Sequence, residues 1–444
     1  MFYKLLIANR GEIALRLIRA CKDMGIRTVA VHSTADVDAL HVRLADESIC
    51  IGPAESKNSY LNISALLSAA EITDADAVHP GYGFLAENHD FAEICENCGI
   101  KFVGPSSKVI RLMGNKIIVR ENMVKAGIPV LPGSEKGLKD ENEALKIAKD
   151  IGFPVILKAA AGGGGRGIKV VHSPTSLPNL FHTARAESLA AFGNGELYIE
   201  KYCQAPRHVE IQIMADEFGN IIHLGERDCS IQRRHQKLLE EAPSPAVDKG
   251  LREEMGKAAV KAARTVGYNN VGTVEFLLDK EGKYYFSEMN TRIQVEHPVT
   301  EMLTGIDIVK EQIRLSSGER LRFKQKDIKT KGHSIECRIT AEDPVNFIPS
   351  SGKVNALHFP GGLGIRVDSG LYNDCEVFPY YDSLIAKVIV YGEDRMEAIA
   401  RMLRALDEFI IEGISTNISF QQKILRDSDF LQGKVTIDFL NRFL

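Results

Sequence analysis

The segment 288–296 carries five polar side chains at alternate positions: Glu288, Asn290, Arg292, Gln294 and Glu296. Successive side chains of a strand point to opposite faces, so an extended segment here would gather all five on one face. Two carboxylates, two amides and a guanidinium on one face suit a charged ligand and gain little as plain structure. A solvated strand face with chance charge alternation is the alternative. We favour the ligand site because matching groups occur elsewhere in the chain.

A predicted β-hairpin brings two carboxylates together. Two runs rich in aromatic and aliphatic residues flank the polar turn 279–283, which is typical of a hairpin. Pairing Leu278 with Tyr285 would place Glu275 directly opposite Glu288. Facing carboxylates repel each other unless a cation lies between them. One or two carboxylates with substrate phosphates commonly hold Mg²⁺ in nucleotide sites, so the hairpin predicts a site for Mg²⁺ (or Mn²⁺).

A glycine run at 162–165 joins two predicted strands, 154–158 and 168–171. No Gly-Lys-Ser/Thr opens a helix there, which argues against a Walker A loop. A glycine hairpin between strands can instead fold over a polyphosphate, because glycine lets backbone N–H groups approach closely and adopt positive φ. Lys158 and Lys116 are candidate phosphate partners. From the glycine run alone, a loop that binds no ligand is an equally good interpretation.

Two further segments have the composition of ligand contacts. Residues 197–203 form an apolar extended segment that ends in polar residues. The backbone edge of such a segment suits an adenine ring, although the segment alone favours an ordinary strand end. Residues 232–237 form a compact basic cluster, and arginine forks suit carboxylates and phosphates. A small-anion pocket fits this cluster better than an RNA patch, because one short cluster in an acidic protein attracts RNA weakly.

The composition is that of an ordinary globular protein with several domains. The 444 residues suggest two to four domains, and 44% hydrophobic with 26% charged residues is typical of a soluble chain. The net charge of -4 provides no basic field for nucleic acid. Of eight cysteines only Cys95 and Cys98 are closely spaced, and without histidine neighbours they indicate incidental thiols on a helix. No stretch resembles a signal peptide or a membrane span, so we expect a cytoplasmic protein without membrane contact.

Three regions differ in their predicted elements. Residues 1–114 alternate strands with helices, which favours a doubly wound parallel sheet. The first turn, Asn9-Arg10-Gly11-Glu12, is not G-x-G-x-x-G, which argues against a nicotinamide dehydrogenase. Residues 115–330 contain the glycine run and the hairpin, with a subdomain expected at about 131–203. Residues 331–444 open with an alternating strand and later contain a predicted helix from about Arg395 to Ile411.

Five sequence blocks resemble biotin carboxylase, the ATP-grasp subunit of acetyl-CoA carboxylase and related biotin-dependent carboxylases. They are KLLIANRGEIA from Lys4, VHPGYGFLAEN from Val78, RDCSIQRRHQK from Arg227, EMNTRIQVEHP from Glu288 and ECRI from Glu336. The resemblance covers essentially the whole chain, and the blocks together are highly specific. It implies an α/β fold with an N-terminal doubly wound parallel sheet, a central ATP-grasp domain with a glycine-rich flap, and a C-terminal mixed α+β domain.

The resemblance implies ATP-dependent carboxylation of biotin by bicarbonate through carboxyphosphate, and it implies a role for each matched residue. The nucleotide would be bound by Lys116, Lys158, Gly164, Gly165, Glu200, Lys201, Tyr202, Cys203, His208 and His235. The metal would be held by Glu275, Glu288 and Asn290. Bicarbonate would be bound by Lys237, Arg292 and the Val295 backbone, and deprotonated by Glu296. Arg338 would stabilise the biotin enolate, with Tyr82 and Gln294 near the biotin ring.

Some features depart from the family pattern or are absent. Ala161 stands where another glycine is expected, and Cys203 takes an adenine-side position that is often aliphatic; neither puts the chemistry in doubt. No Met-Lys-Met biotin-attachment motif occurs, so we expect biotin on a separate biotin carboxyl carrier protein. The family also implies a carboxyltransferase subunit and a homodimer. The final acceptor, whether acetyl-CoA, another acyl-CoA or pyruvate, is chosen outside this chain.

Two rival functions follow from the same nucleotide-binding features. Another carboxyphosphate-using ATP-grasp ligase is disfavoured by the strand that carries Arg338 and by the long matched C-terminal region. A catalytically inactive nucleotide-binding subunit is disfavoured because the implied metal, bicarbonate and biotin residues are all intact.

Overall fold

The N-terminal region is a five-stranded parallel sheet, as predicted. The computed structural model describes residues 1–160 and 167–443. The strand order is β3-β2-β1-β4-β5, and every pair in it is parallel. The elements are β1 Lys4–Ile7, α1 Gly11–Asp23, β2 Arg27–Ser33, α2 Leu40–Leu44, β3 Glu47–Gly52, α3 Ile63–Ile72, β4 Ala77–His79, α4 His89–Asn97 and β5 Lys101–Phe102.

Sequence periodicity explains the first turn of this region. All four residues of β1 are buried, and α1 buries Ile13, Leu17 and Cys21 at intervals of four against the sheet. The chain leaves α1 through Gly25, whose φ of +70° is a left-handed value that glycine adopts at little cost. The turn between β1 and α1 follows the carboxyl end of β1, so it lies at the carboxyl edge of the parallel sheet. There it faces the large cavity described below.

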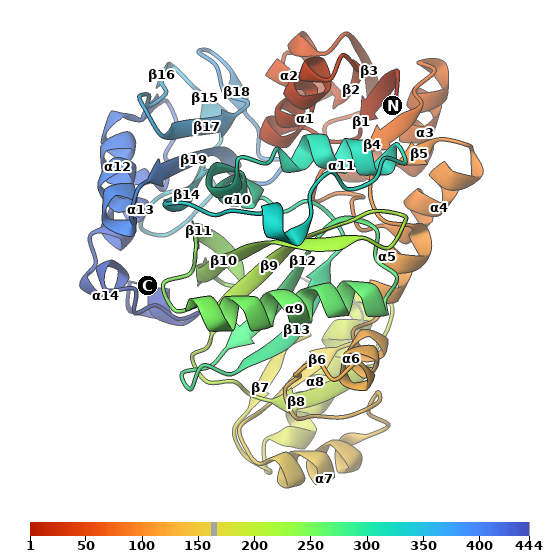
Figure 1. The fold of residues 1–444 in the computed structure, drawn as a ribbon, viewed down its shortest axis with the longest axis vertical. Helices are drawn as coiled ribbons and strands as arrows, with labels where there is room; N and C mark the ends of the chain where they lie inside the picture. Colours follow the sequence, from red (N-terminus) through yellow and green to blue (C-terminus); the bar gives the residue numbers. More distant parts are fainter. Residues whose placement is uncertain (161–166, 444) are drawn as a thin grey trace.

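A small three-stranded sheet forms the lower part of the molecule in Figure 1 and has a hydrophobic core of its own. Its strand order is β7-β6-β8, with β6 antiparallel to both neighbours. The predicted strands on either side of the glycine run are therefore neighbours. The elements leading into and forming this part are α5 Ser107–Met113, α6 Lys116–Lys125, α7 Glu141–Ile151, β6 Val155–Ala159, β7 Lys169–Val171, α8 Leu177–Phe192 and β8 Leu197–Lys201.

An eight-stranded sheet joins the central and C-terminal regions. Its order is β13-β12-β9-β10-β11-β14-β19-β17, and the pairing of β11 with β14 crosses the predicted boundary near residue 330. The C-terminal region thus extends the sheet of the central region instead of forming a separate layer (Figure 1). The strands are β9 Arg207–Ala215, β10 Ile221–Arg233, β11 Gln236–Ala242, β12 Asn270–Leu278, β13 Tyr284–Asn290, β14 His333–Thr340, β17 Ile365–Ser369 and β19 Leu384–Gly392.

Helices and short strands complete these two regions. A long helix, α9, packs on β9 and β10, while α12 packs on β14 and β19. Within residues 1–160 and 167–443, no helix has the length and apolar character needed to cross a membrane. The remaining elements are α9 Lys249–Thr265, α10 His297–Thr304, α11 Ile308–Ser316, β15 Gly352–Lys353, β16 Ala356–His358, β18 Glu376–Val377, α12 Arg395–Glu408, β20 Ile410–Glu412, α13 Ile418–Leu425 and α14 Ser428–Leu431.

The β12–β13 hairpin corrects one predicted register. Leu278 pairs with Tyr284, not with Tyr285 as predicted. The register then shifts at a bulge that contains Ser287, and this extra residue restores the pairing of Glu275 with Glu288. The two carboxylates therefore face each other as predicted, although the route to that pairing differs.

The segment 288–296 is also shorter as a strand than predicted. Strand β13 ends at Asn290, and the chain turns before entering α10 at His297. Pro298 lies in the first turn of α10, where its fixed φ and missing N–H suit a helix start. The alternating polar side chains still meet, but a turn brings them together in place of a single strand face.

Candidate active site

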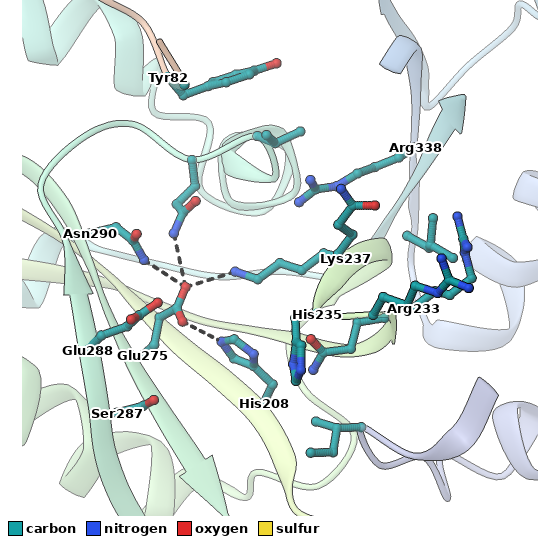
Figure 2. Close-up of a pocket in the computed structure, with 18 of the residues that line it drawn as sticks. Tyr82, His208, Arg233, His235, Lys237, Glu275, Ser287, Glu288, Asn290 and Arg338 are labelled. Atoms are coloured by element: carbon teal, nitrogen blue, oxygen red, sulfur yellow. Dashed lines mark hydrogen bonds and ion pairs between the residues drawn. The ribbon is translucent and has the colours of Figure 1, made fainter. Parts of the chain in front are cut away.

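A cavity of about 1150 Å³ lies between the three regions of the chain. Most of the predicted site residues line it: Tyr82, Lys116, Lys158, Lys201, Tyr202, Cys203, His208, His235, Lys237, Glu275, Glu288, Asn290, Arg292, Gln294, Val295 and Arg338. Two predicted residues, Glu200 and Glu296, are buried in its wall and do not line it. Gly164 and Gly165 lie outside the described residues. Figure 2 shows Glu275, Glu288 and Asn290 together on one side and Arg338 on the other.

The predicted metal ligands lie on the β12–β13 hairpin. The Lys116 ammonium is 2.9 Å from the Glu288 carboxylate, and it is the main cause of the lowered pKa of Glu288. The Glu275 carboxylate lies 2.9 Å from the His208 Nε2 and accepts a hydrogen bond from the Asn290 amide at 2.8 Å. Two facing carboxylates and an amide form a set of hard oxygen donors, which fits Mg²⁺ better than a softer transition metal.

Two lysines on the predicted nucleotide side are held by carboxylates. Lys116 pairs with Glu288, and Lys158 pairs with Glu200 at 2.7 Å. Glu200 also binds Arg120 at 2.9 Å, so its carboxylate orients Lys158 from within the wall and does not face the cavity. The Lys201 ammonium donates to two backbone carbonyls, at 3.0 and 3.1 Å.

The walls of this side suit a flat ring. Ile156, Val170 and Leu277 contribute apolar surface beside the end of β8. Burial raises the pKa of the Cys203 thiol to about 11, so this side chain is a neutral thiol at physiological pH. His235 lies in the tight turn between β10 and β11 with a left-handed φ of 64° and also faces the cavity. All six residues of the basic cluster 232–237 thus line the cavity.

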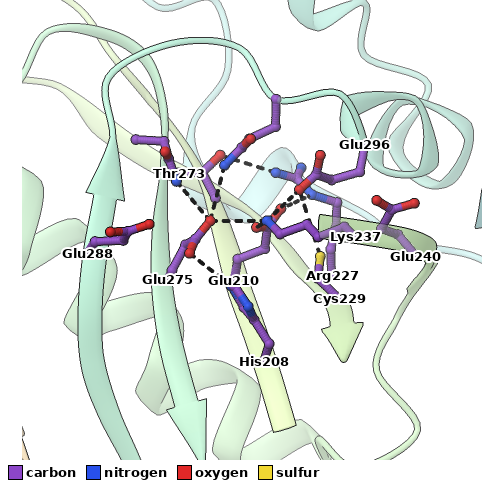
Figure 3. Close-up of polar contacts among 12 residues, drawn as sticks. His208, Glu210, Arg227, Cys229, Lys237, Glu240, Thr273, Glu275, Glu288 and Glu296 are labelled. Carbon is purple, nitrogen blue, oxygen red and sulfur yellow. Dashed lines mark hydrogen bonds and ion pairs between the residues drawn. The ribbon is translucent and has the colours of Figure 1, made fainter. Parts of the chain in front are cut away.

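Lys237 is the centre of a buried ion cluster (Figure 3). Its ammonium lies 2.6 Å from Glu296, 2.7 Å from Glu210 and 3.1 Å from Glu275. Burial alone would lower the pKa of Lys237, but these three carboxylates raise it well above its ordinary value. Lys237 therefore stays positively charged, and it presents that charge at the cavity wall.

A buried arginine stabilises this cluster through its contact with Glu210. Arg227 is fully buried, and its Nε donates to Glu210 at 2.6 Å. Its other nitrogens donate to Gln212 and to the hydroxyls of Thr273 and Thr300. Because Arg227 neutralises one side of Glu210, that carboxylate can bind Lys237 on the other side without an unpaired charge.

Glu296 is fully buried between two cations. Lys237 approaches one carboxylate oxygen at 2.6 Å and Arg338 approaches the other at 2.9 Å. Burial would raise the pKa of Glu296, but these cations hold it well below its ordinary value. Arg338 is itself oriented by Glu240, which accepts from its Nε at 2.6 Å. Glu296 is therefore an ionised carboxylate next to the cavity.

Arg292 bridges the metal and anion sides. Its Nε donates to Glu87 at 2.9 Å, and its other nitrogens donate to Gln294 at 2.9 Å and to the Asn290 oxygen at 3.2 Å. Arg292 and Lys237 both line the cavity, and Asn290 connects them indirectly, because it contacts Arg292 and also donates to Glu275, a partner of Lys237. At the far end of the cavity the Tyr82 hydroxyl donates to Glu12.

Sequence reasoning missed several of these residues: Glu12, Glu87, Glu210, Arg227, Glu240 and Lys387. One signal was available for Glu210. His208, Glu210 and Gln212 alternate along β9, so three polar side chains share one face of a strand that is otherwise buried. A buried strand rarely carries such a row unless partners are present.

Family models and individual relatives match this chain along its whole length. "Biotin carboxylase, N-terminal domain" matches residues 1–110, "Carbamoyl-phosphate synthase L chain, ATP binding domain" matches residues 115–324, and "Biotin carboxylase C-terminal domain" matches residues 336–442. A biotin carboxylase from Nostoc sp. is 59% identical over 440 residues, covering 99% of this chain and 98% of its own.

Two solved structures have the same fold. Biotin carboxylase from Campylobacter jejuni, in a complex with a nucleotide, superposes with a TM-score of 0.98 at 51% identity, covering 100% of this chain and 99% of its own. The biotin carboxylase domain dimer of 2-oxoglutarate carboxylase from Hydrogenobacter thermophilus, with MgADP and bicarbonate, superposes with a TM-score of 0.95 at 52% identity. That match covers 100% of this chain and 98% of the other. The predicted three-part architecture is thereby confirmed.

Proposed function

The chain belongs to the biotin carboxylase family, and on that premise we propose which of its residues carry each step of the reaction. The protein is an ATP-grasp ligase that uses ATP and bicarbonate to carboxylate biotin, with ADP and phosphate as the other products. This is the first half-reaction of acetyl-CoA carboxylase or a related biotin-dependent carboxylase. The observation that carries the residue assignment is the ionised Glu296 held between Lys237 and Arg338 beside the cavity.

ATP would occupy the side of the cavity formed by β6, β8 and the β12–β13 hairpin. Lys116 and Lys158 lie where they can neutralise phosphate oxygens, and each can release its present carboxylate partner to do so. Glu275, Glu288 and Asn290 would hold Mg²⁺, which neutralises charge on the transferred phosphoryl group. The end of β8, with Lys201, Tyr202 and Cys203, would offer its backbone to the adenine. The nucleotide would also be contacted by His208, His235, Gly164 and Gly165.

Bicarbonate would bind between Lys237 and Arg292, close to the Val295 backbone. An anion there competes with Glu296 for Lys237, which weakens the cation's hold on that carboxylate and makes it a stronger base. Glu296 then takes the proton of bicarbonate, and the freed oxygen attacks the γ-phosphorus of ATP. The P–O bond to ADP breaks and carboxyphosphate forms. Holding both reactants in one pocket replaces a bimolecular encounter with a positioned one.

The carboxyl group would then move to biotin at the Arg338 end of the cavity. Carboxyphosphate would break into CO₂ and phosphate, the released phosphate would take the proton from N1′ of biotin, and N1′ would then form a bond to CO₂. Arg338 would stabilise the negative charge that the ureido oxygen gains in this step. Tyr82 and Gln294 also line the cavity and would position the ring.

We propose three features of the protein's setting. Biotin would arrive on a biotin carboxyl carrier protein, and a carboxyltransferase subunit would pass the carboxyl group to the final acceptor. A homodimer is supported by the dimeric domain of the Hydrogenobacter thermophilus relative. A reducing compartment such as the cytosol is supported by the eight cysteines, all of which are unpaired.

Phosphate release from ATP tests the proposal directly. We expect hydrolysis by the purified protein to require bicarbonate and to be stimulated by free biotin. The variant Arg338→Ala should lose biotin carboxylation while its affinity for ADP changes less than about twofold, since Arg338 contacts the acid cluster and not the lysines of the nucleotide side. Turnover of ATP at a rate indifferent to bicarbonate would overturn the proposal. If Arg338→Ala lost nucleotide binding to the same extent as biotin carboxylation, the role assigned to Arg338 would be overturned.

A further inference from the structure

Two consecutive backbone carbonyls beside the cavity are held by buried side chains. The carbonyl of Gln294 accepts from the His297 ring Nδ1 at 2.7 Å and from the His297 N–H at 3.3 Å. The carbonyl of Val295 accepts from the Lys387 ammonium at 3.0 Å. Both side chains are fully buried, so these hydrogen bonds are shielded from water.

Peptide geometry fixes where the matching N–H groups point. The C=O and N–H of a trans peptide lie in one plane and point in opposite directions. Holding the Gln294 carbonyl therefore turns the Val295 N–H away from His297, and holding the Val295 carbonyl turns the Glu296 N–H away from Lys387. Among the described residues neither N–H has a hydrogen-bond partner. Two adjacent free N–H groups form a ready site for an anion.

We propose that Lys387 and His297 are positioning residues, which aim the N–H groups of Val295 and Glu296 at bicarbonate by holding the carbonyls behind them. The inference rests on the proposed bicarbonate site, since Gln294 and Val295 line the cavity beside Arg292. Neither Lys387 nor His297 touches the anion. Their effect is to fix the backbone donors before the anion arrives, which removes the cost of ordering them.

Lys387 is built into the junction of the three regions. Its ammonium lies 3.2 Å from Glu12 of the N-terminal region and 4.0 Å from Asp368, with the Tyr82 ring centre at 5.9 Å. Burial would lower the pKa of Lys387, but Glu12 leads the carboxylates that raise it. The side chain is therefore a charged donor with a fixed position, and its strand β19 pairs it directly with Arg338 on β14.

His297 supplies the second donor as a neutral ring. Burial lowers the pKa of His297 well below its ordinary value, and Lys387 and Arg16 add to that effect. A neutral imidazole carries its proton on one nitrogen only, and a carbonyl oxygen cannot donate. The 2.7 Å contact with the Gln294 carbonyl thus assigns the proton to Nδ1.

A matched pair of substitutions at His297 tests the inference. In His297→Asn an amide N–H can occupy the place of Nδ1–H, whereas His297→Leu fills similar space without a donor. We expect His297→Leu to raise the KM for bicarbonate by about tenfold or more, with the KM for ATP changed less than about twofold. His297→Asn should recover most of the affinity for bicarbonate. Equal KM values for bicarbonate in the two variants would overturn the assignment, as would a parallel rise in the KM for ATP.

Lys387 is tested in a background that removes the carboxylate it balances. Lys387→Met alone leaves Glu12 buried without its cation, so the double variant Lys387→Met/Glu12→Gln is compared with Glu12→Gln. The double variant should raise the KM for bicarbonate by about tenfold over Glu12→Gln, with both variants melting at similar temperatures. An unchanged KM would overturn the role of Lys387. The wild-type control separates the two proposals: if its ATP hydrolysis ignores bicarbonate, the proposed function fails, whereas normal wild-type dependence with unaffected variants overturns only this inference.

Discussion

The nucleotide side and the anion side of the cavity hold their cations in different ways. Within residues 1–160 and 167–443, Lys116 and Lys158 each have one carboxylate partner, whereas Lys237 has three. The Glu288 side chain is 40% exposed, while those of Glu210 and Glu296 are 0% exposed. The partly exposed Lys116–Glu288 pair can open to admit phosphate and metal. A buried cluster with several partners keeps its geometry when a small anion arrives, which is the arrangement that electrostatic preorganisation requires.

The largest expected effect comes from removing the base on the anion side. Glu296→Gln keeps the shape of the side chain but cannot accept a proton, so kcat for bicarbonate-dependent phosphate release should fall by about 100- to 10,000-fold. Lys237 and Arg338 retain Glu210 and Glu240 as partners, so the fold should survive. Steady-state kinetics and an ADP titration measure the two properties. A kcat within about threefold of wild type would mean that another group removes the proton.

The metal pair offers a sharper test of the separation between the two sides. Among the described residues the Glu288 carboxylate forms an ion pair with Lys116 alone, so Glu288→Gln should raise the Mg²⁺ concentration needed for half-maximal activity by about ten- to a hundredfold, with little change in the KM for bicarbonate. Glu275 also binds Lys237, so Glu275→Gln should raise both values. Metal titrations at fixed ATP and at varied bicarbonate measure this. The proposed separation of the two sides is wrong if Glu288→Gln changes the KM for bicarbonate but not the Mg²⁺ concentration needed for half-maximal activity.

The sequence predicted which residues line the two sides of the cavity better than it predicted the residues that support them. The pairing of Glu275 with Glu288 follows from a hairpin pattern, but the bulge at Ser287 has no local signal because it changes which backbone groups pair and not the residue types. The turn after Asn290 could have been anticipated from Pro298, which favours a helix start and limits the length of the preceding strand.

The anion cluster shows where prediction from one sequence stops. Glu210, Arg227 and Lys237 come from three strands, and their meeting depends on the registers of β9 with β10 and of β10 with β11, both of which contain irregularities. A local hydrophobic pattern sets which face a residue occupies, but it does not set such long-range registers. Family resemblance supplied the proposed role of Lys237, whereas only the structure identified Glu210 and Arg227 as its supports.

Stability as a function of pH separates the supporting carboxylates, and here the expected effects are moderate. Burial, with Glu240 nearby, raises the pKa of Glu336 well above its ordinary value, although Lys387 and Arg338 oppose the shift. A raised pKa gives stability that is present below the unfolded pKa of 4.5 and lost as pH rises through the folded pKa. Glu336→Gln cannot ionise, so its free energy of unfolding relative to wild type should increase by about 1 kcal/mol from about pH 5 to about pH 8.

Glu241 is the matched control for this prediction, with the opposite sign. His333 and Arg395 lower its pKa against the effect of burial, so its stabilising contribution is present above the unfolded pKa of 4.5 and is lost as pH falls. Glu241→Gln should therefore cost about 3 kcal/mol at neutral pH and less in acid. Urea unfolding at several pH values measures both variants. The assignment is wrong if the two variants show the same dependence on pH.

The smallest effect is expected from two cysteines that belong to neither side of the cavity. Cys95 is buried in α4 and Cys98 is exposed at the C-cap of that helix, and neither lines the cavity. Burial raises the pKa of the Cys95 thiol to about 12, which leaves it protonated and unreactive. Cys98→Ser should leave kcat and the KM values for ATP and bicarbonate within about twofold of wild type.

Cys95→Ser should lower the free energy of unfolding by about 1 kcal/mol, because it buries a hydroxyl where a thiol packs as a small apolar group. Its kinetic constants should still match those of wild type, since Cys95 packs inside the core of the N-terminal region and does not line the cavity. A loss of bicarbonate dependence in either cysteine variant would show that the N-terminal region acts on the anion side through α4. In that case the two sides of the cavity would not be independent, because the N-terminal sheet would be coupled to the ion cluster around Lys237.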